Sequence, residues 1–155
     1  MPLQTGQAAP NFSLFDTVKN KVSLSDYKGK NVVLIFFPLA FSGVCTKELC
    51  EITENYSAYQ KLNAEIIGIS IDSLFTNGKF KEIYNMPFPL LSDFNREASE
   101  AYDNILPSFA FEYKGVSRRS VFVIDGSGII RYMEQLPSPG DYPNMAALQA
   151  AVAAL

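Results

Sequence analysis

Short apolar runs that alternate with amphipathic stretches set the pattern of this chain. Residues 31–37 (Asn-Val-Val-Leu-Ile-Phe-Phe) are apolar on both faces after the first residue, and residues 65–71 (Glu-Ile-Ile-Gly-Ile-Ser-Ile) form a second such run. Runs of this kind are typical of central strands that helices cover on both sides of a sheet. Between them, apolar side chains recur at helical spacing over residues 44–62, which predicts a helix.

Shorter elements complete the pattern. Residues 11–15 and 21–24 predict a β-hairpin around the turn Lys19-Asn20. Further helices are predicted over 76–84, over 96–102 with Asp93 as N-cap, and over 144–155, and further strands over 90–91, 120–124 and 129–133. This order predicts one α/β domain spanning residues 1–155. We expect a thioredoxin-like fold with a mixed central sheet, an N-terminal β-hairpin extension and a C-terminal helix.

Composition narrows the range of functions. The chain is 48% hydrophobic and 19% charged with a net charge of −3, and it has no basic cluster, so we expect no nucleic-acid partner. The longest apolar run is far shorter than the ~20 residues that cross a membrane, and we expect no membrane partner. Residues 1–5 lack a charged start followed by an apolar run, which makes the cytoplasm the expected location.

The chain contains two cysteines, Cys45 and Cys50, and no histidine. This composition excludes the usual serine triad and a histidine-ligated metal, and two thiolates cannot complete a four-thiolate metal site within one chain. The glutamates near Cys50 lack ligand spacing, and Glu51 and Glu54 are interpreted as the solvated face of a helix. We expect no metal and no cofactor. Cysteines in a reducing compartment point to catalysis or redox sensing.

Cys45 lies just past a predicted strand, where a helix should begin. A thiol attacks as its thiolate. Without histidine, a protein can stabilise that anion with the free amides of a first helical turn, with an arginine, or with a hydroxyl hydrogen bond. The sequence offers all three, because Ser42 stands three residues earlier and Arg118-Arg119 lies downstream. The alternative interpretation of Cys45 is a small buried apolar side chain, and Cys50 has an alternative of its own, in which it merely packs on the inner face of the helix.

The spacing of the two cysteines restricts how they can react together. Five residues on an ideal helix separate the Cα atoms by roughly 8–9 Å, whereas a disulfide needs about 4.4–6.8 Å. We therefore expect that Cys45 and Cys50 cannot bond while the helix is intact. A disulfide between them would require at least the first helical turn to unwind.

The segment from Pro38 to Cys45 reads Pro-x-x-x-Ser-x-x-Cys, and Arg119 follows far downstream. This pattern resembles the core motif of the peroxiredoxins, Pro-x-x-x-Thr/Ser-x-x-Cys. Residues 9–14, 22–30 and 119–126 also look similar to the family, so the likeness spans nearly the whole chain. The resemblance implies a thiol-dependent peroxidase that reduces hydrogen peroxide and organic hydroperoxides.

The resemblance also implies a role for each matching residue of the motif. Cys45 would be the peroxidatic cysteine, which a peroxide oxidises to a sulfenic acid. Pro38 would shield the thiolate and shape the pocket. Ser42 would hydrogen-bond the peroxide oxygens through its hydroxyl.

Two charged positions match the family as well. Arg119 would polarise the peroxide and stabilise the thiolate, and Glu48 matches a position that orients this arginine. Arg118 matches no catalytic position and is interpreted as a surface charge.

Two subgroups of the family match different parts of the chain. Cys50 resembles the resolving cysteine of the bacterioferritin-comigratory (Q-type) group, which forms an intrachain disulfide with the peroxidatic cysteine. Residues 38–45 and 136–140 look more like the one-cysteine alkyl hydroperoxide reductase E group. We favour an intrachain disulfide Cys45–Cys50 that thioredoxin or a glutaredoxin-like protein reduces. The alternative is an external thiol that reduces the sulfenic acid directly.

Other functions stay open at this point. A thiol–disulfide oxidoreductase on the same fold would carry Cys-x-x-Cys, whereas the spacing here is Cys-x4-Cys. A redox sensor without turnover is a third alternative. Finally, Phe41, Phe75, Phe94 and Phe109 fall in loop-like regions, where they could form a homodimer face or pack as core aromatics.

Overall fold

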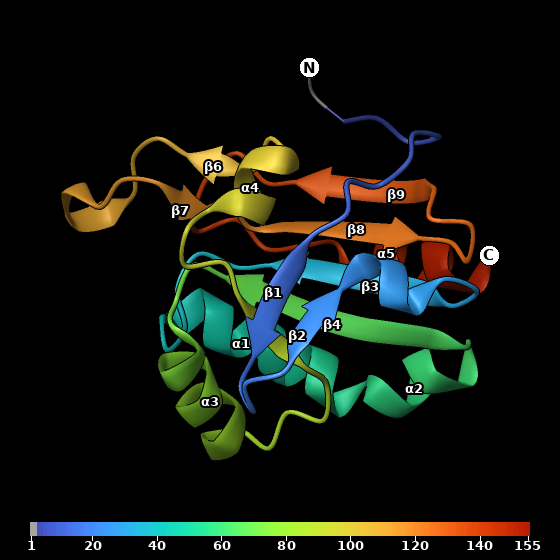
Figure 1. The fold of residues 1–155 in the computed structure, drawn as a ribbon, viewed down its shortest axis with the longest axis horizontal. Coiled ribbons are helices and arrows are strands. Elements are labelled where there is room, and N and C mark those ends of the chain that lie inside the picture. The colour runs from blue at the N-terminus through green and yellow to red at the C-terminus, as the bar shows by residue number, and fades with distance from the viewer. Residues whose placement is uncertain (1–2) are drawn as a thin grey trace.

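The two apolar runs predicted as central strands lie side by side in the middle of a seven-stranded sheet (Figure 1). The computed structural model describes residues 3–155. Across the sheet the strands are β2 (Lys21–Ser23), β1 (Ser13–Asp16), β5 (Leu90–Ser92), β4 (Ala64–Ser70), β3 (Asn31–Phe36), β8 (Ser120–Ile124) and β9 (Ile130–Gln135). The central strands β3, β4 and β5 pair in parallel and the outer pairs are antiparallel, so the predicted mixed sheet is confirmed.

Helices and loops cover both faces of this sheet. The helices are α1 (Gly43–Glu54), α2 (Tyr56–Lys61), α3 (Leu74–Ile83), α4 (Glu97–Ala101) and α5 (Met145–Ala153). Side chains of α1, α2, α3 and α5 form one core with alternate residues of β3, while the other residues of β3 join a second core with β1 and α4. This double coverage explains why β3 needs apolar side chains on both faces. Within residues 3–155, no helix combines the length and apolar character needed to cross a membrane.

Two details of the predicted helices are wrong. The continuous helix over residues 44–62 is interrupted at Asn55, which ends α1 and begins α2, and its side-chain amide donates to the Glu51 carbonyl at 2.9 Å. The N-cap of α4 is Arg96 and not Asp93. The Asp93 carboxylate nevertheless accepts hydrogen bonds from the amides of Ala98 and Ser99 at 3.0 and 2.7 Å. It therefore satisfies the free amides of that helix from three residues further away.

A small second sheet lies outside the predicted pattern. The strands β6 (Ile105–Leu106) and β7 (Val116–Ser117) pair with each other, and the loop between them projects beyond the main sheet (Figure 1). Strands of two residues are too short to create a periodic signal. Phe111 and Glu112 in this loop adopt positive φ angles of 62° and 61°, which such residues rarely do.

The topology brings three segments to one edge of the sheet. Because β3 and β8 are antiparallel with Phe36 opposite Ser120, Arg119 lies beside the residue that follows β3. The loop of residues 37–42 and the start of α1 continue from the same end of β3. This edge holds the carboxyl ends of the parallel strands, where open α/β sheets commonly place their sites.

Candidate active site

The thiol of Cys45 is buried at the start of a helix. Cys45 is the third residue of α1 and is 0% exposed, and Ser42 adjoins the helix as its N-cap. The Thr46 amide bonds back to the Ser42 carbonyl at 2.9 Å, so the three amides before it have no partner inside the helix. These free amides give the helix start a partial positive charge beside the sulfur.

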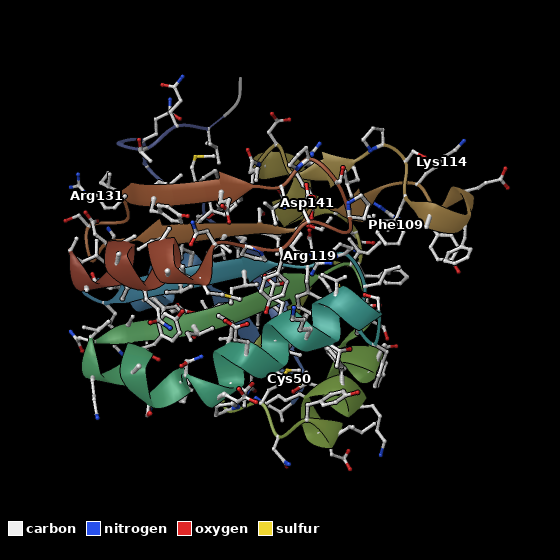
Figure 2. The ribbon with its side chains drawn as sticks, turned by 180° about the vertical axis from the view of Figure 1, so that it is seen from behind. Cys50, Phe109, Lys114, Arg119, Arg131 and Asp141 are labelled. Carbon is white, nitrogen blue, oxygen red and sulfur yellow. The ribbon has the colours of Figure 1, made fainter. Side chains whose placement is uncertain are left out.

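A buried guanidinium completes the surroundings of this sulfur. Arg119 Nη1 lies 3.3 Å from Cys45 Sγ and 2.9 Å from Glu48 Oε1, and Nη2 donates to the Pro139 carbonyl at 3.2 Å. Arg119 and Glu48 are only 2% and 0% exposed. Figure 2 shows Arg119 between β8 and α1; Arg119 directly precedes β8, and Glu48 belongs to α1. The structure thus brings Cys45, Glu48 and Arg119 together, as the sequence predicted.

Two acidic groups share this single cation. Burial raises the pKa of Glu48 to about 7, with smaller contributions from Glu134 and Glu51, and the attraction of Arg119 only partly opposes the rise. Burial by itself would lower the pKa of Arg119, but the Cys45 and Glu48 charges outweigh it and raise that pKa. Arg119 therefore stays charged, and Glu48 exchanges its proton near neutral pH.

Ser42 and Pro38 lie in the loop before α1. The Ser42 hydroxyl donates to the Leu39 carbonyl at 2.8 Å and does not cap the helix. Its hydrogen is thus already used, and its oxygen lone pairs remain as acceptors. Pro38 is buried two residues after the end of β3.

The structure does not bring Cys50 to this site. Both cysteines are free thiols in an intact α1, and Figure 2 shows Cys50 and Arg119 on opposite sides of that helix. Cys50 is partly buried, and this burial together with the nearby Glu54 raises the pKa of its thiol. A reaction between the two cysteines therefore needs α1 to unwind, as the spacing predicts.

Sequence reasoning noted residues 136–140 only for their family likeness and missed that the segment of residues 136–143 contacts α1 through Tyr142. The Tyr142 hydroxyl donates to Glu51 Oε1 at 2.7 Å, and Lys47 Nζ lies 4.6 Å from the centre of the Tyr142 ring. Glu51 is therefore not simply a solvated residue. Arg118 is likewise more than a surface charge, because it is half-buried and donates to the Leu136 carbonyl at 3.1 Å. No short motif marks contacts between residues so far apart.

A buried thiol at a helix start, beside a buried guanidinium on a thioredoxin-like sheet, defines a thiol-based oxidoreductase that works without histidine. The comparisons with known proteins narrow this class. Residues 5–133 match the AhpC/TSA family. Peroxiredoxin Bcp of Bacillus subtilis is 42% identical over 130 residues, which cover 83% of this chain and 82% of that protein. A putative peroxiredoxin bcp of Coxiella burnetii is 39% identical over 84% of this chain and 87% of its own length.

Solved structures agree on the fold. Peroxidoxin BcpB from Mycobacterium tuberculosis superposes with a TM-score of 0.85 at 24% identity, over 99% of this chain and 98% of that chain. The reduced 2-Cys peroxiredoxin of Plasmodium vivax gives a TM-score of 0.85 at 27% identity, over 97% of this chain and 81% of that one. The chain belongs to the AhpC/TSA family and is a peroxiredoxin of the bacterioferritin-comigratory type. Its activity is that of a thiol peroxidase, which takes a peroxide as oxidant and a thiol as reductant.

Proposed function

We propose that Cys45 is the peroxidatic cysteine of this enzyme. Its thiolate attacks one peroxide oxygen, an S–O bond forms as the O–O bond breaks, and the departing oxygen takes up a proton to leave as water or an alcohol. The sulfur is oxidised to a sulfenic acid and the peroxide is reduced. The observation that carries the proposal is the contact of 3.3 Å between Arg119 Nη1 and the buried Cys45 Sγ at the helix start.

Each neighbour of the sulfur has a defined role in this step. Arg119 stabilises the charge that moves from sulfur to the departing oxygen, and Glu48 orients Arg119 through the hydrogen bond of 2.9 Å. Ser42 accepts a hydrogen bond from the peroxide, because its own hydrogen is held by the Leu39 carbonyl. Pro38 forms part of the wall that keeps water away. Since Sγ is shielded in this closed state, the peroxide enters on a small displacement of the side chains above it.

We further propose that Cys50 resolves the sulfenic acid. Once α1 unwinds, the Cys50 thiolate attacks the oxidised sulfur of Cys45, an S–S bond forms, and hydroxide leaves and becomes water with the proton of Cys50. An external dithiol, for which thioredoxin or a glutaredoxin-like protein is our proposal, then reduces the disulfide. The cytoplasm would supply such a reductant.

The position of Cys50 within α1 supports an alternative as well. Because the intact helix keeps Cys50 on the side away from Arg119, an external thiol could reach the sulfenic acid before the helix unwinds. In that case the enzyme would act as a one-cysteine peroxiredoxin.

Mass spectrometry after one equivalent of hydrogen peroxide tests the assignment. We expect the wild-type chain to lose two hydrogens, Cys50→Ser to retain one added oxygen, and Cys45→Ser to remain unmodified. Wild-type reactivity in Cys45→Ser would refute the peroxidatic role. Normal turnover of Cys50→Ser with thioredoxin would refute the resolving role and favour the one-cysteine mechanism.

We also propose that the chain forms a homodimer. Phe41, Phe75 and Phe94 are 44%, 70% and 63% exposed, which supports a contact face, whereas Phe109 is half-buried. Sedimentation of the wild-type chain beside Phe75→Ser tests this face. A monomer at all accessible concentrations would refute it.

A further inference from the structure

The loop of residues 37–42 holds an unfavourable backbone conformation next to the reacting sulfur. Phe41 has a φ angle of 68°, in the left-handed region that a residue with a bulky side chain rarely adopts. Such a residue costs about 1–3 kcal/mol and persists only when its surroundings hold it. The bonds within the loop, from the amide and the hydroxyl of Ser42 to the Leu39 carbonyl, are local and cannot fix the loop against the rest of the protein.

Asp72 fixes this loop from outside. Its Oδ2 accepts the amide hydrogen of Ala40 at 2.8 Å, across 32 residues of sequence. The same oxygen accepts the hydroxyl of the fully buried Ser70 at 2.7 Å, and the Asp72 carbonyl accepts the Ser92 hydroxyl at 2.6 Å. Asp72 is thereby tied to both β4 and β5, which are rigid strands in the middle of the sheet.

The energies of the two effects are comparable. A hydrogen bond from an amide to an ionised carboxylate contributes about 1.5–3 kcal/mol, similar to the cost of the Phe41 conformation. The Phe41 ring adds a contact with Phe80 at a centroid distance of 4.9 Å, but this ring remains 44% exposed. The Phe37 amide also donates to the Ile69 carbonyl at 3.0 Å, but this bond lies where the loop leaves β3. The bond from Ala40 to Asp72 is therefore the main polar contact that holds the part of the loop around Phe41 in place.

We propose that Asp72 is a positioning residue for peroxide reduction, which acts through the Ala40 amide to hold Ser42 and the first turn of α1 in line with Cys45. This inference rests on the proposed function. It assigns to Asp72 a role in the rate of the oxygen displacement and none in the chemistry of the thiol itself.

Two substitutions of Asp72 distinguish its role in positioning the loop from an effect of its charge or of a general loss of stability. Asp72→Ala removes the acceptor, and we expect the second-order rate constant for hydrogen peroxide to fall by about 100-fold, the typical cost of a misplacement of ~1 Å. Alkylation of Cys45 by iodoacetamide needs only the sulfur and should change far less. Asp72→Asn should restore most of the peroxide rate, because both donors contact a single oxygen that an asparagine amide can supply.

A matched control loses a similar bond elsewhere. Asp26→Ala removes a carboxylate that accepts the Ser23 amide at 2.9 Å near the N-terminal hairpin, and it should leave both rates unchanged. If Asp72→Ala fails to fold, Ser70→Ala replaces it, because Ser70 holds Asp72 through its hydroxyl and accepts the Asp72 amide at 3.3 Å. We expect Ser70→Ala to lower the peroxide rate selectively, by less than Asp72→Ala.

The outcomes distinguish the proposal from its premise. A wild-type peroxide rate in Asp72→Ala, or in Ser70→Ala where that variant stands in, would overturn it. So would an equal loss of peroxide reduction and alkylation, or an Asp72→Asn as slow as Asp72→Ala. Failure of the proposed function would look different, because wild-type protein would then alkylate at Cys45 but consume no peroxide.

Discussion

Replacing Tyr142 by phenylalanine removes one hydroxyl from the segment that contacts α1. In the proposed cycle, Cys50 can reach Cys45 only after α1 unwinds, and the bond of 2.7 Å between Tyr142 and Glu51 ties this helix to residues 136–143. Burial and the contact with Glu51 raise the pKa of Tyr142, so its hydroxyl keeps the hydrogen that it donates. The phenylalanine ring would still lie beneath Lys47.

The size of the effect follows from this one bond. A hydrogen bond to a charged acceptor contributes about 1.5–3 kcal/mol, and the lower value suits a half-buried pair. Because 1.4 kcal/mol corresponds to about a factor of ten, the unwound population of α1 should rise about tenfold in Tyr142→Phe. Formation of the disulfide draws on that population, so its rate should also rise about tenfold.

Rapid-quench mass spectrometry measures this rate. After one equivalent of hydrogen peroxide, the form with one added oxygen should convert faster in Tyr142→Phe to the form that lacks two hydrogens. Tyr113→Phe is the matched control, because Tyr113 is 52% exposed and lies in the loop between β6 and β7. An unchanged or slower conversion in Tyr142→Phe would refute the reasoning that this segment restrains α1.

Three further predictions concern stability. Arg119→Met leaves Glu48 buried without its cation and should lower the free energy of unfolding by about 3–5 kcal/mol. Adding Glu48→Leu should recover most of this loss in urea titrations without restoring peroxide reduction, and a double variant as unstable as the single one would contradict the argument. Burial raises the pKa of Glu48 from 4.5 to about 7, so the folded protein holds a proton that the unfolded chain releases between these values. Stability should therefore fall by about 3 kcal/mol as the pH rises through this window, and Glu48→Gln should abolish that slope in urea midpoints measured across it. Gly68→Ala would place a Cβ 2.6 Å from the buried Leu90 side chain and should cost about 1–3 kcal/mol in thermal unfolding, whereas a neutral result would show that the Leu90 side chain can move aside.

The sequence predicts the sheet well because its central strands are compatible with few other structures. Residues 31–37 are apolar on both faces, so only a doubly covered strand can bury them, and β3 lies there. The break at Asn55 could not be predicted in the same way. The apolar spacing continues through it, and the interruption depends on how α1 and α2 each pack on the sheet.

Some residues of the candidate site can also be predicted from the sequence, and others cannot. Cys45, Ser42 and Pro38 belong to one short motif, and Glu48 and Arg119 carry charges that a buried site must pair, so a sequence can reveal them. The contacts of Asp72 with Ala40 and of Tyr142 with Glu51 join residues 32 and 91 positions apart. Such pairs are set by the arrangement of whole elements, and each partner alone has the appearance of an ordinary polar residue.

The sharing of Arg119 between Cys45 and Glu48 has a consequence for the oxidised enzyme. In the proposed cycle, conversion of the thiolate to a sulfenic acid removes a negative charge beside the guanidinium. Arg119 is then less neutralised, so the pKa of Glu48 should fall from its value of about 7 and more of this carboxyl group should be ionised near neutral pH. In this way the protonation state of Glu48 would report the oxidation state of the Cys45 sulfur.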